Sequence, residues 1–457
     1  MEASSERAER LKPARAGTRV PGAVLLGLVL LSLYAAAQTP SPAPQGGSVQ
    51  DEPILDLDAL LERLRAMAPR TVAGVVRVLS GLDPTPGQEL AGLDRELSNV
   101  DPERVLDLLE PLKREEIAAD LKLVARTAAN DRTTLGMLRI LERFGSAEDL
   151  LGAARWTQLE LEQSGSDALL EATLRDATHR ILRRDARGFE WISGVIQSSS
   201  ADVGLSVCRG AGDTESLRAL PVFASLLGWS ANLDVGLLQQ IGRLSAQCEL
   251  PAEPRLQSVV RGFLGSDDPR IAREAAVVCA RLEDFDAADT LVDLLDGGDR
   301  SVSDASAFAL ETLTGLAFGA DAGRWRTWLA AEELWLDETA PGLIAALQDP
   351  DAGQVVLALN ELSRHRYQRA TIASALISGL EDERAEIRVL TCTALGRIGS
   401  KAALTALIAS LDDPEEPVVN AAHAALCQIS GRELAADPQV WMALVAGERA
   451  ASRPADN

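Results

Sequence analysis

The chain has 457 residues, of which 46% are hydrophobic, 4% aromatic and 25% charged, and its formal net charge at pH 7 is −23. This length exceeds what one compact core normally supports, whereas a stack of repeats grows in one dimension and escapes that limit. A charge this negative repels phosphate backbones, so the composition excludes nucleic acid as an expected partner. A well-solvated surface explains the charge most simply, and a basic protein partner is the alternative.

The N-terminus has the parts of an export signal. Basic residues at 7–19 precede an apolar run at 20–37 that ends in three alanines, with Gln38 next. A basic flank, an apolar run and a small-residue end indicate a signal peptide, and the run is short for a membrane span of about 20 residues. We therefore interpret residues 1–37 as a cleaved signal peptide, with an uncleaved membrane anchor as the alternative. Either way the body lies outside the cytoplasm, in the periplasm, in the cell envelope or secreted.

The next two segments differ in periodicity. Alternating prolines and a glycine pair at 38–52 predict a disordered linker. Residues 53–250 carry apolar residues at three-and-four spacing without a fixed period, which predicts divergent helical repeats. Asp101 and Pro102 are typical of a helix start, as N-cap and first helical residue.

A clear period begins at Pro251. Ile271 and Val302 occupy the same place in units 31 residues apart, and residues 301–329 return 116 positions later as 417–445. Each unit has a Leu-rich helix, a loop with acidic residues and an Ala-rich second helix, and a loop Asp is expected to cap the second helix. Self-similarity at this period indicates a solenoid. The sequence therefore predicts an all-α fold, an α-solenoid of helical hairpin repeats.

The two long copies also end alike. A glycine closes one helix, an Asp N-caps the next, an Ala stands before that Asp, and a Trp follows at the fourth helical position: Gly315, Ala320, Asp321 and Trp325, then Gly431, Ala436, Asp437 and Trp441. We interpret the Trp-bearing segments as capping helices, because terminal repeats must differ from internal ones. The expected arrays are 251–336 and 337–447, each with its capping helix, and 448–457 is a disordered tail.

The loops, of which LEDERAEI and LDDPEEPV are examples, and the Ala-rich helices after them, such as IRVLTCTALGRI and VVNAAHAALCQI, carry a resemblance. They resemble HEAT repeats, in particular the short units of phycobilin lyases, and the chain looks like an exported HEAT-repeat protein of bacterial type. The match is clear over 255–447. Over 53–250 it rests only on the general pattern of apolar residues. The resemblance implies helical hairpins and says nothing of the partner.

Residues that could carry chemistry are scattered. The three histidines (His179, His365, His423) are far apart, no C-x-x-C joins any of the five cysteines, and no nucleophile-elbow, zinc-protease or phosphate-loop motif occurs. Cys279, Cys392 and Cys427 lie in Ala-rich runs and are interpreted as small buried hydrophobes. The sequence therefore predicts no catalytic residue, no cofactor, no metal and no enzyme.

Two features are candidate partner-binding sites. Acidic residues recur once per repeat, and we name the residues at 381–386 and 412–416 the acidic ridge; its candidates are Glu381, Asp382, Asp412 and Asp413. N-capping and solvation explain such residues more simply than a calcium site, because no spaced calcium-loop pattern is present. Trp328 and Trp335 share one helix face, which fits either a seam between the arrays or an interface anchor.

These observations predict a non-enzymatic scaffold or adaptor that binds another protein through the solenoid surface. Contact with a membrane is expected only through 20–37, if that run is uncleaved. Two alternatives stay open. One is an enzyme or enzyme accessory of the HEAT-like lyase type, and the other is a self-associating structural envelope protein.

The first testable prediction concerns export. The mature chain should begin at or near Gln38 and fractionate outside the cytoplasm, because the apolar run ends in a cleavage pattern. N-terminal sequencing of the native protein checks this, and an intact Met1 in a soluble cytoplasmic pool would contradict it.

Overall fold

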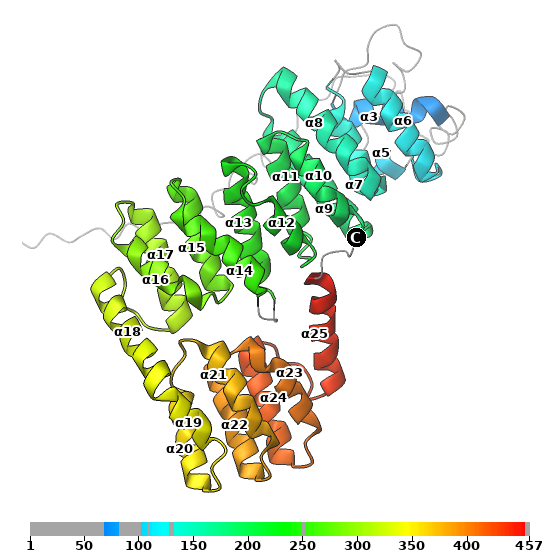
Figure 1. Ribbon diagram of the computed structural model, residues 1–457. Coiled ribbons are helices and arrows are strands. Elements are labelled where there is room, and N and C mark those ends of the chain that lie inside the picture. The colour runs from blue at the N-terminus through cyan, green and yellow to red at the C-terminus, as the bar shows by residue number, and fades with distance from the viewer. Residues whose placement is uncertain (1–67, 82–101, 108, 128–131, 249–251, 453–457) are drawn as a thin grey trace, which may run out of the picture. The chain divides into compact units, whose positions relative to one another are not determined.

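Figure 1 shows a computed structural model of the chain, which describes residues 68–81, 102–107, 109–127, 132–248 and 252–452. Within these ranges the regular secondary structure consists of α-helices and short 3₁₀ helices, and no β-strand occurs. The α-helices, in chain order, are α3 (Ala68–Leu79), α5 (Pro102–Asp107), α6 (Arg114–Thr127), α7 (Thr134–Phe144), α8 (Leu150–Ser164), α9 (Ala168–Arg184), α10 (Gly188–Gln197), α11 (Ala201–Gly212), α12 (Ala219–Leu226), α13 (Ala231–Ser245), α14 (Pro254–Arg261), α15 (Pro269–Arg281), α16 (Ala288–Leu295), α17 (Arg300–Thr314), α18 (Ala322–Glu338), α19 (Ala340–Ala346), α20 (Ala352–Leu362), α21 (Arg369–Leu376), α22 (Ala385–Ile398), α23 (Leu404–Ala409), α24 (Glu416–Ser430) and α25 (Pro438–Ser452). Short 3₁₀ turns are η1 (Ala147–Asp149), η2 (Gly262–Gly265), η3 (Phe285–Ala287), η4 (Ile377–Glu381), η5 (Lys401–Ala403) and η6 (Ser410–Asp412).

The helices pair into hairpins that stack, so the protein is an all-α solenoid (Figure 1). The second helices α7, α9, α11, α13, α15 and α17 pack each on the next and form one layer, and the first helices α8, α10, α12, α14 and α16 cover it. After α18 the pattern resumes with α20, α22 and α24 as second helices and α19, α21 and α23 as first helices. Helices α7–α13, which belong to the 53–250 region, follow the same hairpin pattern as the helices after them.

Several sequence predictions fall outside the described residues. These are the signal segment at 1–37, the linker at 38–52 and the N-cap at Asp101, although α5 does begin at Pro102. At the other end α25 continues to Ser452, beyond the boundary expected at 447. No helix in the described part of the chain is both long and apolar enough to cross a bilayer.

Small residues set the distance between stacked second helices. A Cβ atom on Gly210 of α11 would lie 2.4 Å from the Arg175 carbonyl oxygen of α9. On Gly396 of α22 it would lie 3.1 Å from the Cβ of Ala425 in α24. Helix backbones approach this closely only where side chains are absent or minimal, because packed interiors leave no spare volume.

The two capping segments have the local geometry that the sequence predicts. Gly315 and Gly431 follow α17 and α24 with φ of 78° and 69°, a left-handed conformation that glycine adopts without strain. The Asp321 carboxylate accepts a hydrogen bond from the backbone N–H of Arg324, and that of Asp437 accepts one from Gln439. N-capping by both aspartates is therefore confirmed.

Both tryptophans of these segments are core residues. Trp325 and Trp441 are 0% and 1% exposed, and each indole N–H donates to the carbonyl oxygen six residues earlier, Gly319 at 2.8 Å and Ala435 at 2.9 Å. The Trp325 ring packs on Phe318, whereas Ala320, the residue before the N-cap, is exposed. The apolar contact that seats this ring therefore includes a residue three positions before the N-cap.

The second testable prediction follows from this burial. Trp325→Ala and Trp441→Ala should each lower the free energy of unfolding by about 3–5 kcal/mol, because each removes a fully buried ring. The loss should be confined to the adjoining array, since a solenoid couples only neighbours. Denaturant titration with site-resolved hydrogen exchange measures both. Trp229→Ala is the control, because that ring is 58% exposed. Equal losses in all three variants would contradict a capping role.

Candidate functional site

The acidic loops of the second array all make the same turn. The carboxylates of Asp349, Asp382 and Asp413 each accept a hydrogen bond from the backbone N–H two residues further on, at 2.8, 2.8 and 2.9 Å. This Asx turn replaces a backbone turn and directs the chain into the second helix. The recurrence of these aspartates thus has a structural cause in every repeat of this array.

The expected N-capping by loop aspartates holds only in part. It is confirmed for α15, α17 and α20, where Asp268, Asp299 and Asp351 accept from the first backbone N–H groups. It is wrong for α22 and α24, whose N-cap residues are Arg384 and Glu415 and make no side-chain capping bond. In those loops the Asx turn two residues earlier organises the helix entry instead.

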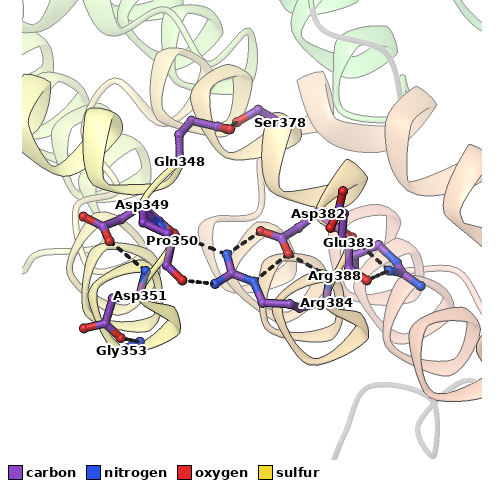
Figure 2. A network of polar contacts seen from close by, with 10 residues as sticks. All are labelled: Gln348, Asp349, Pro350, Asp351, Gly353, Ser378, Asp382, Glu383, Arg384 and Arg388. Carbon is purple, nitrogen blue, oxygen red and sulfur yellow. Dashed lines mark hydrogen bonds and ion pairs between the residues drawn. The ribbon is translucent and has the colours of Figure 1, made fainter.

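Two arginines, Arg384 and Arg388, connect the three loops in series, and we call them the arginine ladder. Figure 2 shows the link that Arg384 makes between the first two loops. Arg384 binds Asp382 through two parallel hydrogen bonds of 2.9 and 2.8 Å and also donates to the Pro350 carbonyl of the preceding loop at 3.1 Å. Arg388 binds Asp413 of the following loop in the same bidentate manner, at 2.8 and 2.9 Å. Bidentate guanidinium–carboxylate pairs are strong and fix orientation, so the ladder holds successive loops in register.

The ladder changes what the acidic ridge can offer a partner. Hydrogen bonds from Arg384 hold the pKa of Asp382 below its usual range, and those from Arg388 do the same for Asp413. Both carboxylates are therefore ionised and already neutralised within the protein. Glu381 and Asp412 are exposed and take part in no ion pair among the described residues. Of the four acidic candidates, these two are available to a partner.

The exposed positions of the second helices form a surface that sequence reasoning missed. Leu357 of α20 and Leu390 of α22 are 63% and 37% exposed and stand 33 residues apart, at the sixth position of each helix. Two further exposed pairs follow at the same step, so that the full set, which we name the repeat face, is Leu357, Asn360, Arg364, Leu390, Thr393 and Arg397. Its apolar row lies toward the acidic loops at the helix N-termini, and its arginine row lies toward the C-termini. The common step of 33 was the signal in the sequence.

The tryptophan candidates lie at the junction of the arrays. Trp328 is half-buried, with ring centroids 6.0 Å from Trp325 and 5.6 Å from Tyr367 in edge-on geometry. Trp335 is also half-buried and stacks on His365 at 3.4 Å. Both rings therefore join α18 to the loop between α20 and α21, and only part of each ring is open to a partner.

Four of the cysteines and His423 lie in surroundings that do not favour nucleophilic or metal chemistry. Burial raises the pKa to about 12 at three thiols: Cys208, Cys279 and Cys392. These thiols are neutral at physiological pH and poor nucleophiles. Cys427 is half-buried, and its sulfur is 3.5 Å from Nε2 of His423, which also lies 2.7 Å from the Leu434 carbonyl. Within the described ranges no three His, Cys, Asp or Glu side chains are arranged to hold a metal.

A comparison with protein families identifies the repeats in part of the second array. Residues 340–427 match the family model for HEAT repeats, so the second array is a HEAT-repeat segment. No curated protein matches the chain significantly. The solved structures to which this chain shows some similarity include human deoxyhypusine hydroxylase in complex with glycerol (17% identity, 54% of this chain and 97% of that one, TM-score 0.24), an engineered protein (15%, 79% and 98%, 0.30) and importin beta (14%, 90% and 54%, 0.30). Likenesses of this size carry no argument about what this chain binds.

The third testable prediction concerns the ladder. Asp413→Asn should lower the free energy of unfolding at neutral pH by about 1–2 kcal/mol, because Arg388 loses a charged bidentate partner. The pKa of Asp413 is lower in the folded than in the unfolded chain, so the pair stabilises above the unfolded value of about 3.9 and its contribution disappears as pH falls through the folded value. The difference between wild type and variant should therefore shrink in acid.

Denaturant titrations from neutral pH to about pH 2 measure this difference. Asp412→Asn is the matched control, since it neutralises the adjacent, exposed carboxylate. Equal destabilisation by both variants at neutral pH would contradict the ladder.

Proposed function

We propose that this protein is a non-enzymatic scaffold or adaptor that acts outside the cytoplasm and binds another protein through the repeat face. The observation that carries the proposal is the exposed apolar row of Leu357 and Leu390 on stacked HEAT-repeat helices. HEAT-repeat scaffolds generally mediate protein–protein interaction, and stacked repeats present extended binding surfaces. The location rests on our interpretation of residues 1–37 as an export signal.

The distribution of charge on this surface suggests the partner's chemistry. Exposed acids of the ridge, Glu381 and Asp412 among them, flank one side of the apolar row, and Arg364 and Arg397 flank the other. A partner segment with an apolar stripe and basic residues along one edge is complementary to this order. Apolar contacts would supply affinity, and the acidic ridge would steer encounter.

The fourth testable prediction uses the apolar row. The double variant Leu357→Asp, Leu390→Asp should lose at least about tenfold in affinity for the native partner, equivalent to about 1.4 kcal/mol, because it places charge on the centre of the contact. Partners are captured on immobilised protein from the native envelope fraction, identified by mass spectrometry and titrated. Leu159→Asp is the control, as that side chain is 55% exposed on α8. A partner retained equally by all three proteins would refute the repeat face.

The association rate distinguishes binding through the acidic ridge from binding through Trp328 and Trp335. Glu381→Lys with Asp412→Lys should slow association and reduce its salt dependence, because exposed charges act over a Debye length of about 8 Å at physiological ionic strength. Asp176→Lys with Glu190→Lys, exposed acids of α9 and α10, makes the same charge change elsewhere. A salt-independent on-rate that neither pair alters would favour contact through Trp328 and Trp335.

The two rival functions have their own signatures. Visible absorbance or substrate turnover by the purified protein would favour the enzyme or enzyme-accessory class. Oligomers that grow with concentration in light scattering would favour a self-associating envelope protein. A monomer with no absorbance beyond its aromatic residues is the outcome expected of an adaptor.

A further inference from the structure

A cavity of ≈540 Å³ lies between helices α12–α15 and residues of the second array, and its lining includes none of the repeat-face residues. Helices α12, α13, α14 and α15 and described residues directly beside them supply most of its wall, and Ala370 and 400–402 of the second array complete it. Its volume falls in the range of about 300–1,000 Å³ that small-molecule sites occupy.

The meeting of the two arrays is held by specific contacts. Arg369 is buried, lies 3.1 Å from the Glu283 carboxylate and packs over the Phe285 ring at 5.3 Å. Lys401 donates to the Cys248 carbonyl at 2.5 Å. Both contacts involve residues of the cavity wall, so the wall is fixed by a paired charge and a hydrogen bond as well as by apolar packing.

Most of the lining is apolar. Aliphatic and aromatic side chains come from α12, α14 and the turn after α15, among them Leu220, Leu256, Leu282 and Phe285. One polar atom stands out: Ser245 is 5% exposed, and its hydroxyl has no hydrogen-bond partner among the described residues. A buried hydroxyl without a partner is rare in proteins and fits a site whose ligand supplies one.

The charged residues of the wall favour an anion. Three cations, Arg255, Arg281 and Lys401, line the cavity against two acids, Glu253 and Glu283, and Glu283 is already paired with Arg369. Of these cations Lys401 is half-buried, whereas Arg255 and Arg281 are exposed, as Glu253 is. This is a locally basic wall in a chain of net charge −23. The Lys401 ammonium has three N–H donors, and the Cys248 carbonyl takes one of them.

We propose that this cavity binds a small amphiphile with an apolar body and one anionic group, such as a long-chain carboxylate. The apolar body fills the space between α12 and α14, and the anion accepts hydrogen bonds from Lys401 and Arg281. Because the ligand touches both arrays, its binding fixes their contact. This site is independent of the repeat face, so the loss of either activity leaves the other intact.

The fifth testable prediction uses two probes that differ by one charge. The dye 1-anilinonaphthalene-8-sulfonate carries a sulfonate on an apolar ring system, and N-phenyl-1-naphthylamine is the same ring system without it. We expect saturable one-to-one binding of the anionic dye by fluorescence titration, competed by laurate. Ala224→Trp fills the cavity from α12 and should weaken the dye at least about tenfold. Ser225→Trp is the matched control, because Ser225 is next to Ala224 on α12 but is exposed and does not line the cavity.

Lys401→Gln tests the anionic group. It should weaken the sulfonated dye and laurate several-fold while leaving the neutral dye unchanged. Thermal melting checks that each variant folds, and Leu256→Trp fills the cavity from α14 if Ala224→Trp does not fold. Unchanged dye affinity in a folded cavity-filling variant would overturn the site. Equal effects of Lys401→Gln on both dyes would overturn the anionic ligand.

Discussion

The packing of each helical hairpin on its neighbour is the constraint on which the rest of this structure depends. No hairpin buries its own apolar face, so stability is a sum of contacts between adjacent units. The second helices lie so close that there is no room for a Cβ atom at Gly210 and only a tight fit for one at Gly396. Once that distance is set, the loops at one end of the layer are brought within reach of each other, and arginines such as Arg384 and Arg388 connect them. The loops, the exposed faces and the junction cavity are all consequences of the stack.

The stack also decides which charges are free to act. An acidic loop in an isolated hairpin would be fully solvated. Here Arg388 of one unit binds Asp413 of the next, and Arg384 joins Asp382 of its own loop to the Pro350 carbonyl of the preceding loop. Asp382 and Asp413 therefore belong to the architecture, although they look like their neighbours in the sequence. The two surfaces left for partners differ in kind. The repeat face is open and amphipathic and suits a polypeptide, and the cavity is small and lined mostly by apolar side chains and suits a small molecule.

Local features of the fold could be predicted from the sequence because local chemistry determines them. The N-caps at Asp321 and Asp437 and the helix ends at Gly315 and Gly431 depend on residues within a few positions of each other. The arginine ladder could not be predicted, because Arg388 and Asp413 are paired only when two loops face one another. The repeat face required knowing which helical positions remain uncovered. The cavity could not be predicted from the sequence, because its wall combines Leu220 with Lys401 and depends on how distant parts of the chain meet.

The capping helix at Trp325 lies in the middle of the chain, and this position has a mechanical consequence. A solenoid without an internal cap transmits the loss of one unit to the next, because the newly bared face has lost its cover. Here α18 packs on α16 with Trp325 fully buried, so the first array stays covered when the units after it open. We therefore expect α18 to stop unfolding from spreading: when heat, force or a protease opens the second array, the last hairpin of the first array keeps its cover. At the location proposed above, outside the cytoplasm and without chaperones that consume ATP, confining damage to one array would lengthen the working life of the protein.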